Sequence, residues 1–176
     1  MKKWTHLIVF AILSGISTLI RTWGMVTNSL NQSSAQDVTK ELEKLGVPNS
    51  EELAKVSQAT MEFQNNLINK ALIVLLLIAM VAMIVFLIQK KYELSSYTYI
   101  GYLFGTLILA TYSFIGTKGV AQLYSDETMR QATEAGALGG YIFSIVLFAI
   151  YFGLTVFFML RKPKETPSME TTSTDI

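Results

Sequence analysis

The sequence predicts an all-α protein, an integral membrane four-helix bundle that carries a small helical hairpin on its outer side. Hydrophobic residues make up 51% of the 176 residues, and they concentrate in four segments. Each segment approaches the roughly 20 apolar residues that a helix needs to cross a bilayer. Basic residues cluster beside these segments, and the connection after the first one has helical apolar spacing. The predicted spans are about 7–25, 67–88, 97–115 and 138–160, within a membrane domain 1–162.

The first span runs from about Leu7 to Met25. Trp4 and Trp23 stand nineteen residues apart, about 28 Å along a helix, which suits aromatic anchors at the two interfaces of a bilayer. A basic start before an apolar core is also typical of a signal peptide, but no small-x-small cleavage site follows. We therefore expect a retained span, with a cleaved signal as the alternative.

A polar face marks the outer half of this span, where Ser14, Thr18 and Arg21 share one side of the helix. An ionisable residue inside a span is a functional-site candidate by default. Arg21 lies only about 5–8 Å from the outer interface, where a long side chain reaches water. Two interpretations stay open: a structural anchor, or a contact with an anion or with an outer acid such as Glu134 or Asp126.

The connection 33–66 predicts a helical hairpin. Ser33 or Ser34 can cap its first helix, Gly46 ends that helix, and Pro48-Asn49 makes a turn. The second helix is expected to continue without interruption into the second span, as one rod of about 60 Å.

The apolar side chains of the hairpin are expected to pack against one another, with Val38, Leu42 and Leu45 of the first helix meeting Val56 and Phe63 of the second. The covered surface predicts a small cap over the bundle or, alternatively, a docking surface or lid. The candidate outer contact surface is Val38, Leu42, Val56 and Phe63.

The orientation follows from three basic clusters, which lie on one side of the membrane if the spans number four. They are Lys2-Lys3, Lys90-Lys91 and Arg161-Lys162 with Lys164. The positive-inside rule then places both termini in the cytoplasm and the hairpin outside. The tail 163–176 is rich in Ser and Thr and almost free of apolar residues, so we expect it to be disordered.

Small residues at four-residue spacing predict close helix packing in the last two spans. They are Ala132, Gly136, Gly140 and Ser144 in span four, and Gly101 and Gly105 in span three. We expect packing within the chain, with self-association or a partner membrane protein at span four as the alternative. Ser125 or Asp126 is expected to begin the helix that continues into span four.

The chain has no cysteine, one histidine and a formal charge of +1, and no acid lies inside an apolar segment. No nucleophile–base pair, metal-ligand spacing or phosphate-binding loop is present. We therefore expect no enzyme activity, cofactor, metal or nucleic-acid partner. The bilayer is the expected partner.

The predicted function is a non-catalytic subunit or accessory of a transport or export system, a permease assembly, in the cell membrane. The order of one span, an outer segment and three further spans resembles the membrane halves of some ABC-type permeases, at the level of topology. The alternatives are a regulatory or scaffold protein that binds an extracytoplasmic partner through 33–66, and a small oligomeric pore.

Overall fold

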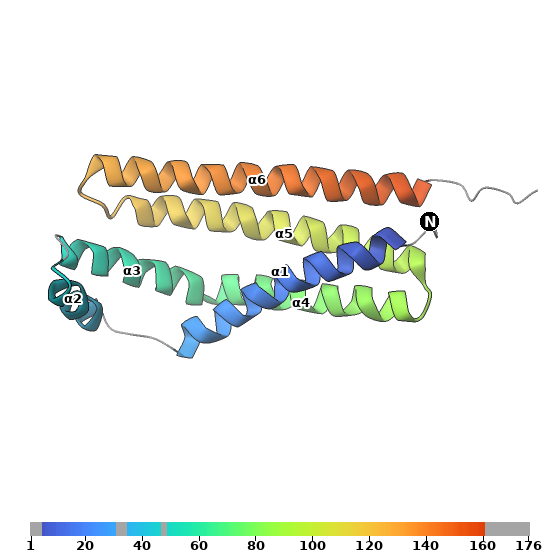
Figure 1. Cartoon of the computed structure of the whole chain (residues 1–176), viewed down its shortest axis with the longest axis horizontal. Coiled ribbons are helices and arrows are strands. Elements are labelled where there is room, and N and C mark those ends of the chain that lie inside the picture. The colour runs from blue at the N-terminus through green and yellow to red at the C-terminus, as the bar shows by residue number, and fades with distance from the viewer. Residues whose placement is uncertain (1–4, 31–34, 47–48, 161–176) are drawn as a thin grey trace, which may run out of the picture.

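The computed structural model describes residues 5–30, 35–46 and 49–160 (Figure 1). The helices are α1 (Thr5–Leu30), α2 (Ala35–Lys44), α3 (Ser50–Asn65), α4 (Leu67–Ile88), α5 (Tyr92–Ala121) and α6 (Glu127–Leu160). No strand occurs among the described residues, which confirms the all-α class. The four helices α1, α4, α5 and α6 are long and apolar enough to cross a membrane, and each contains one of the four predicted spans.

The helices α4, α5 and α6 lie side by side, each antiparallel to the next, and α1 crosses α4 diagonally (Figure 1). The α2–α3 hairpin and the α5–α6 turn lie at one end of the molecule, which we call the hairpin end. The start of α1, the α4–α5 turn and the end of α6 lie at the opposite end.

The core forms where α1, α4 and α5 meet. Its buried apolar residues are Leu7, Phe10, Ala11, Ile73, Leu76, Met80, Met83, Tyr99, Tyr102, Leu103 and Leu109. Gly105 lets α4 and α5 approach closely, because a Cβ atom built on it would lie 2.8 Å from Cδ2 of Leu76. Gly101 has open space beside it, so only Gly105 of this predicted pair lies at a close contact within the chain.

The expectation of one uninterrupted helix from the hairpin into the second span is wrong, because the chain breaks at Asn66. The Asn66 backbone is extended, with φ −65° and ψ 156°. Its side-chain oxygen accepts a hydrogen bond from the Asn69 backbone N–H at 2.7 Å, which caps the start of α4. Its side-chain amide donates to the Tyr112 hydroxyl of α5 at 2.6 Å. Asn69 in turn donates from its side chain to the Gln64 carbonyl, which would otherwise be left open at the end of α3.

The hairpin is formed by α2 and α3, which pack against each other. Gly46 follows α2 with φ +68°, the left-handed conformation that commonly ends a helix. The expected apolar contacts need correction: Leu45 is 77% exposed, and Phe63 turns toward α5, where its ring stacks on Tyr112 at 5.1 Å.

Several expectations lie outside the described residues. They are the Trp4 anchor, the basic clusters at Lys2-Lys3 and at Arg161-Lys162 with Lys164, the cap at Ser33 or Ser34, Pro48 of the turn, and the tail 163–176.

Candidate functional site

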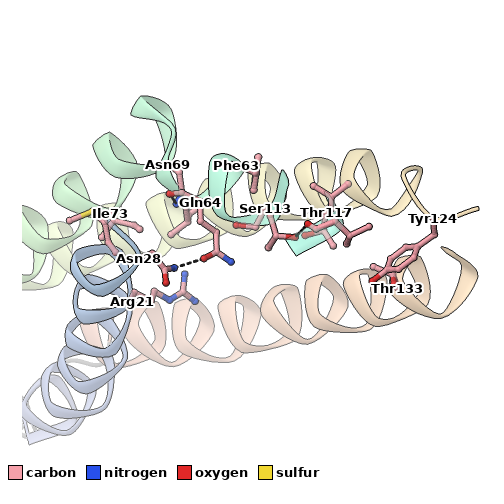
Figure 2. A pocket seen from close by; sticks show the side chains of 16 residues that line it. Arg21, Asn28, Phe63, Gln64, Asn69, Ile73, Ser113, Thr117, Tyr124 and Thr133 are labelled. Atoms are coloured by element: carbon pink, nitrogen blue, oxygen red, sulfur yellow. Dashed lines mark hydrogen bonds between the residues drawn. The ribbon is translucent and has the colours of Figure 1, made fainter. Parts of the chain in front are cut away.

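A cleft lies between α1, α5 and α6, and toward the hairpin end it is also lined by α3 and α4 (Figure 2). At the opposite end α1 touches α6. The His6 ring stacks on Phe158 with 4.3 Å between the ring centroids, and Phe10 meets Tyr151 edge to face with the centroids 5.1 Å apart. From there α1 runs diagonally across α4, away from α6 (Figure 1). The divergence of the two helices leaves the cleft open between them.

Arg21 lies at the centre of this cleft, which we call the Arg21 cleft. It consists of three hollows of about 490, 320 and 160 Å³, and Arg21 lines all of them. Among the described residues that line the hollows, Arg21 alone carries a formal charge. The cleft is therefore electropositive.

Hydroxyl groups from α1, α5 and α6 make up much of the polar lining. They are Ser17, Thr106, Ser113, Thr117, Tyr141 and Ser144. Ser113 and Thr117 lie one turn apart on α5, and both line the two larger hollows beside Arg21. Their hydroxyls form no hydrogen bond with any described residue. The cleft thus presents one cation and at least two available hydroxyl donors.

The predicted polar face of α1 divides into two parts. Ser14 shares a hydrogen bond with the Tyr99 hydroxyl at 3.0 Å, and Thr18 shares one with the Tyr102 hydroxyl at 2.8 Å. These bonds fasten α1 to α5, and Thr18 is only 3% exposed. Arg21, one turn further along, faces the cleft instead.

The two tyrosines were missed from sequence because tyrosines near span ends are usually interface anchors. The available signal was a matched spacing: Tyr99 and Tyr102 are three residues apart on α5, and Ser14 and Thr18 are four apart on α1. Both spacings place the pair on one helix face.

A second group of polar contacts joins α1 to α3 at the hairpin end of the cleft. The Asn28 side chain donates to Gln64 at 2.5 Å (Figure 2). The Asn65 side chain donates to the Asn28 carbonyl at 3.0 Å. Ser29 donates to the Asn65 side-chain oxygen at 3.0 Å. These contacts hold the end of α1 beside the end of α3.

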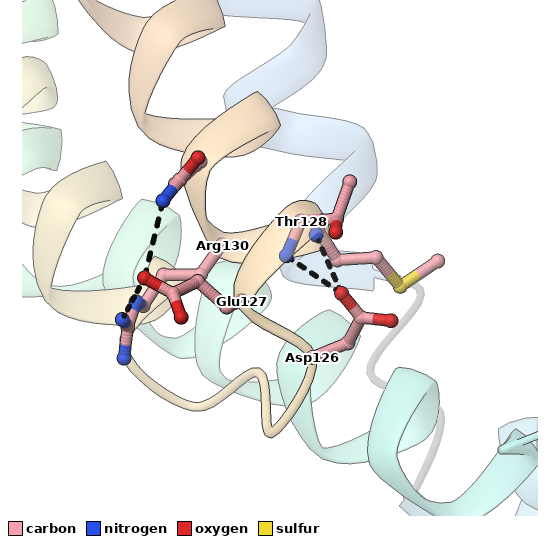
Figure 3. Close-up of polar contacts among 6 residues, drawn as sticks. Asp126, Glu127, Thr128 and Arg130 are labelled. Carbon is pink, nitrogen blue, oxygen red and sulfur yellow. Dashed lines mark hydrogen bonds and ion pairs between the residues drawn. The ribbon is translucent and has the colours of Figure 1, made fainter.

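The suggested ion pair between Arg21 and an outer acid does not form among the described residues. Within the described part of the chain, neither Glu134 nor Asp126 pairs with Arg21. Asp126 instead caps α6, as its carboxylate accepts the backbone N–H groups of Thr128 at 2.7 Å and Met129 at 3.1 Å (Figure 3). The expected start of this helix is therefore confirmed at Asp126.

The Met129 and Thr128 hydrogen bonds hold the pKa of Asp126 below its usual value. A carboxyl whose pKa is lower in the folded state stabilises the fold above its unfolded pKa, and this contribution is lost as the pH falls through the folded pKa. Beside it, Glu127 pairs with Arg130 at 3.6 Å (Figure 3).

The small residues of span four lie partly on the surface and partly at the cleft. Ala132 and Gly136 are exposed, whereas Gly140 and Ser144 line the hollows. A Cβ atom built on Gly136 or Gly140 would meet no other atom within 4 Å. The expected close packing within the chain is therefore not seen at these glycines, and packing against a second molecule stays a prediction.

The candidate outer contact surface also needs correction. Val56 is buried and, like Phe63, lines the largest hollow of the cleft, so these two side chains belong to the interior. Val38 and Leu42 of α2 remain half-buried on the hairpin.

The fold and the cleft define a class of all-helical protein with four helices of membrane-spanning length and one arginine in a hydroxyl-lined cleft between them. The chain belongs to the family described as "Domain of unknown function (DUF8777)", whose model matches residues 1–168. Neither a curated protein nor a solved structure matches the chain.

Proposed function

We propose that this chain is a non-catalytic, multi-pass protein of the cell membrane that serves as a subunit or accessory of a transport or export system. The observation that carries the proposal is the free side of α6. Only 6% of the most apolar window of α6 is buried, against 22% in each of the other three long helices. A row of small residues, Ala132 and Gly136, lies on this free side. Such a row lets a helix of another subunit approach closely.

The membrane placement has both termini in the cytoplasm and the hairpin outside. Lys90 and Lys91 follow α4 at the end of the molecule where α1 begins and α6 ends (Figure 1). The positive-inside rule favours this end as the cytoplasmic one. The 30 residues of α5 and 34 of α6 span about 45 and 51 Å, longer than the hydrocarbon core of about 30 Å. At the hairpin end, the excess length of α5 packs against α3.

A single introduced cysteine tests the placement, because the chain has no cysteine of its own. Gln58 of α3 and Gln89 after α4 are both exposed. In intact cells, we expect a membrane-impermeant maleimide to label Gln58→Cys fully and to leave Gln89→Cys unlabelled. Permeabilised cells should label both variants equally. Labelling of Gln89→Cys from outside, or protection of Gln58→Cys, would refute the orientation.

The subunit role predicts that Gly136→Ile removes a partner without harming the fold. A Cβ atom at this position meets no other atom within 4 Å in the described structure, whereas a bulky side chain obstructs a closely packed helix of another molecule. Affinity purification of the full chain from membranes of its native host should recover a stoichiometric integral membrane partner. We expect Gly136→Ile to reduce this recovery about tenfold, the equivalent of about 1.4 kcal/mol.

Gly153→Ile is the matched control, because Gly153 also lies on α6, is exposed, and has open space beside it. It should leave the recovery unchanged. Purification of the wild type without any stoichiometric partner, or full partner recovery with Gly136→Ile, would contradict the proposal.

A pore lined by the polar face of α1 has less support, because Ser14 and Thr18 are engaged by tyrosines of α5. The scaffold role would depend on the surface of α2, where Val38 and Leu42 are half-buried.

A further inference from the structure

We propose that the Arg21 cleft binds the phosphate group of an anionic phospholipid, which enters sideways from the outer leaflet between α1 and α6. This inference depends on the membrane placement proposed above, and it is independent of the subunit role.

The first step of the argument is charge. Arg21 forms no ion pair with a described residue, and no acid lines any of the three hollows. An anionic or strongly polar partner would stabilise a cation placed beside a bilayer, because charge is costly near hydrocarbon. The planar guanidinium group offers several N–H donors in a geometry that matches phosphate oxygens. The missing partner is therefore best supplied by a phosphate.

The second step is the supply of hydroxyl donors. Ser113 and Thr117 face the same two hollows as Arg21, and neither hydroxyl has a hydrogen-bond partner in the described structure. Both side chains are half-buried, so their hydroxyls are available to a ligand in the hollows. Phosphate oxygens accept hydrogen bonds from hydroxyls, and we expect one phosphate to contact Arg21 together with the two side chains that line the same hollows.

The third step is access. The helices α1 and α6 touch at the end opposite the hairpin and then diverge (Figure 1). Residues of both helices line the hollow between them, and in the proposed placement we expect a lipid to enter there from the side. Asn28 contacts the end of α3 at the hairpin end of the cleft. Arg21 lies seven residues before it, about 10 Å deeper along the helix. This depth lies within reach of an outer-leaflet headgroup by an extended arginine side chain.

The fourth step concerns the acyl chains. Below Arg21, the smallest hollow is lined by Leu13, Leu147 and Phe148. Outside the hollows, Ile16 and Ile20 of the same helix α1 are more than half exposed. A lipid whose phosphate lies at Arg21 can place its chains along these apolar side chains. A soluble phosphate would not contact these apolar side chains, and this difference favours a phospholipid as the ligand.

The experiment is native mass spectrometry of the full chain, purified in detergent and stripped of lipid. Dioleoyl phosphatidylglycerol or dioleoyl phosphatidylcholine is titrated into wild type and Arg21→Gln. We expect the wild type to prefer phosphatidylglycerol, and Arg21→Gln to weaken that binding about tenfold or more. Ser113→Ala combined with Thr117→Val should weaken it by a smaller factor while the arginine remains.

Arg130→Gln is the matched control, since it removes the same charge from the hairpin end outside the cleft. It should bind phosphatidylglycerol like the wild type. Size-exclusion chromatography would reveal unfolding of Arg21→Gln. In that case, the binding measured for Ser113→Ala combined with Thr117→Val tests the proposal. Unchanged binding in both cleft variants, or no preference between the two lipids, would overturn the inference.

Two further outcomes would also overturn it. Displacement of the lipid by millimolar inorganic phosphate would assign the site to a soluble phosphate. The second outcome is a stoichiometric partner protein that co-purifies with the wild type, places an acidic side chain at Arg21 and is lost in Arg21→Gln. It would assign the cleft to a helix of that partner. Failure of the partner purification alone leaves this result unaffected, because the titration uses the isolated chain.

Discussion

Replacing Gly116 with alanine is expected to lower the stability of the chain by about 1–3 kcal/mol, the usual range for overpacking a filled site. A Cβ atom built on Gly116 would overlap three ring atoms of Phe63 on α3. The ring cannot withdraw without cost, because it stacks on Tyr112 of the same helix α5 at 5.1 Å. The result is a partial separation of α3 from α5.

Thermal unfolding of the purified chain in detergent measures this effect, at about 2–4 °C per kcal/mol for a chain of this size. Gly119→Ala is the control, because the same methyl group on α5 meets no atom within 4 Å. It should be neutral or slightly stabilising, since alanine favours a helix over glycine. If Gly116→Ala and Gly119→Ala have the same melting temperature, the close contact between α3 and α5 is refuted.

A smaller side chain at Phe63 should relieve the overlap with a methyl group at position 116. Gly116→Ala combined with Phe63→Leu should melt higher than the sum of the two single changes predicts, because the smaller side chain makes room for the methyl group. Such a positive coupling energy is characteristic of residues in direct contact. Additive effects would mean that the two residues do not touch.

Replacing Asn66 with alanine is expected to cost about 2 kcal/mol, the sum of a lost helix cap and a lost hydrogen bond. The cap is the bond from the Asn69 backbone to the Asn66 side chain, and the second bond joins Asn66 to the Tyr112 hydroxyl. Thermal unfolding again provides the measurement. An unchanged melting temperature would show that the break between α3 and α4 does not depend on this side chain.

Tyr112→Phe separates the two contributions, because it removes only the hydroxyl contact and leaves the cap intact. We expect it to lose about half as much stability as Asn66→Ala. Equal losses from the two variants would assign the whole effect to the bond between α4 and α5.

The four long helices were predictable because each apolar segment must reach a length set by the bilayer. The α6 cap at Asp126 was also predictable, since its carboxylate acts on N–H groups two and three residues away. The break at Asn66 was not. The apolar spacing from Leu53 to Leu67 runs across it, and the bond that fixes Asn66 comes from Tyr112, far away along the chain.

The site was predictable only in part. Arg21 was identified because a cation inside an apolar segment is rare and costly. The hydroxyls that accompany it, Ser113 and Thr117, come from another helix about ninety residues later, and spacing within one helix cannot reveal them. The small residues of α6 suggested contact, whereas the structure shows that Gly140 helps to keep the cleft open.

The break at Asn66 has a mechanical consequence in the proposed membrane placement. Helices respond to a thinner or thicker bilayer by tilting. The 16 residues of α3 extend about 24 Å, so a rigid α3–α4 rod that tilted by about 20° would move the hairpin tip by about 8 Å. Because the chain is bent at Asn66, the direction of α3 follows its contact with α5 through Phe63 and not the axis of α4. We therefore expect a change of membrane thickness to displace the hairpin tip less than it would displace the end of one rigid rod.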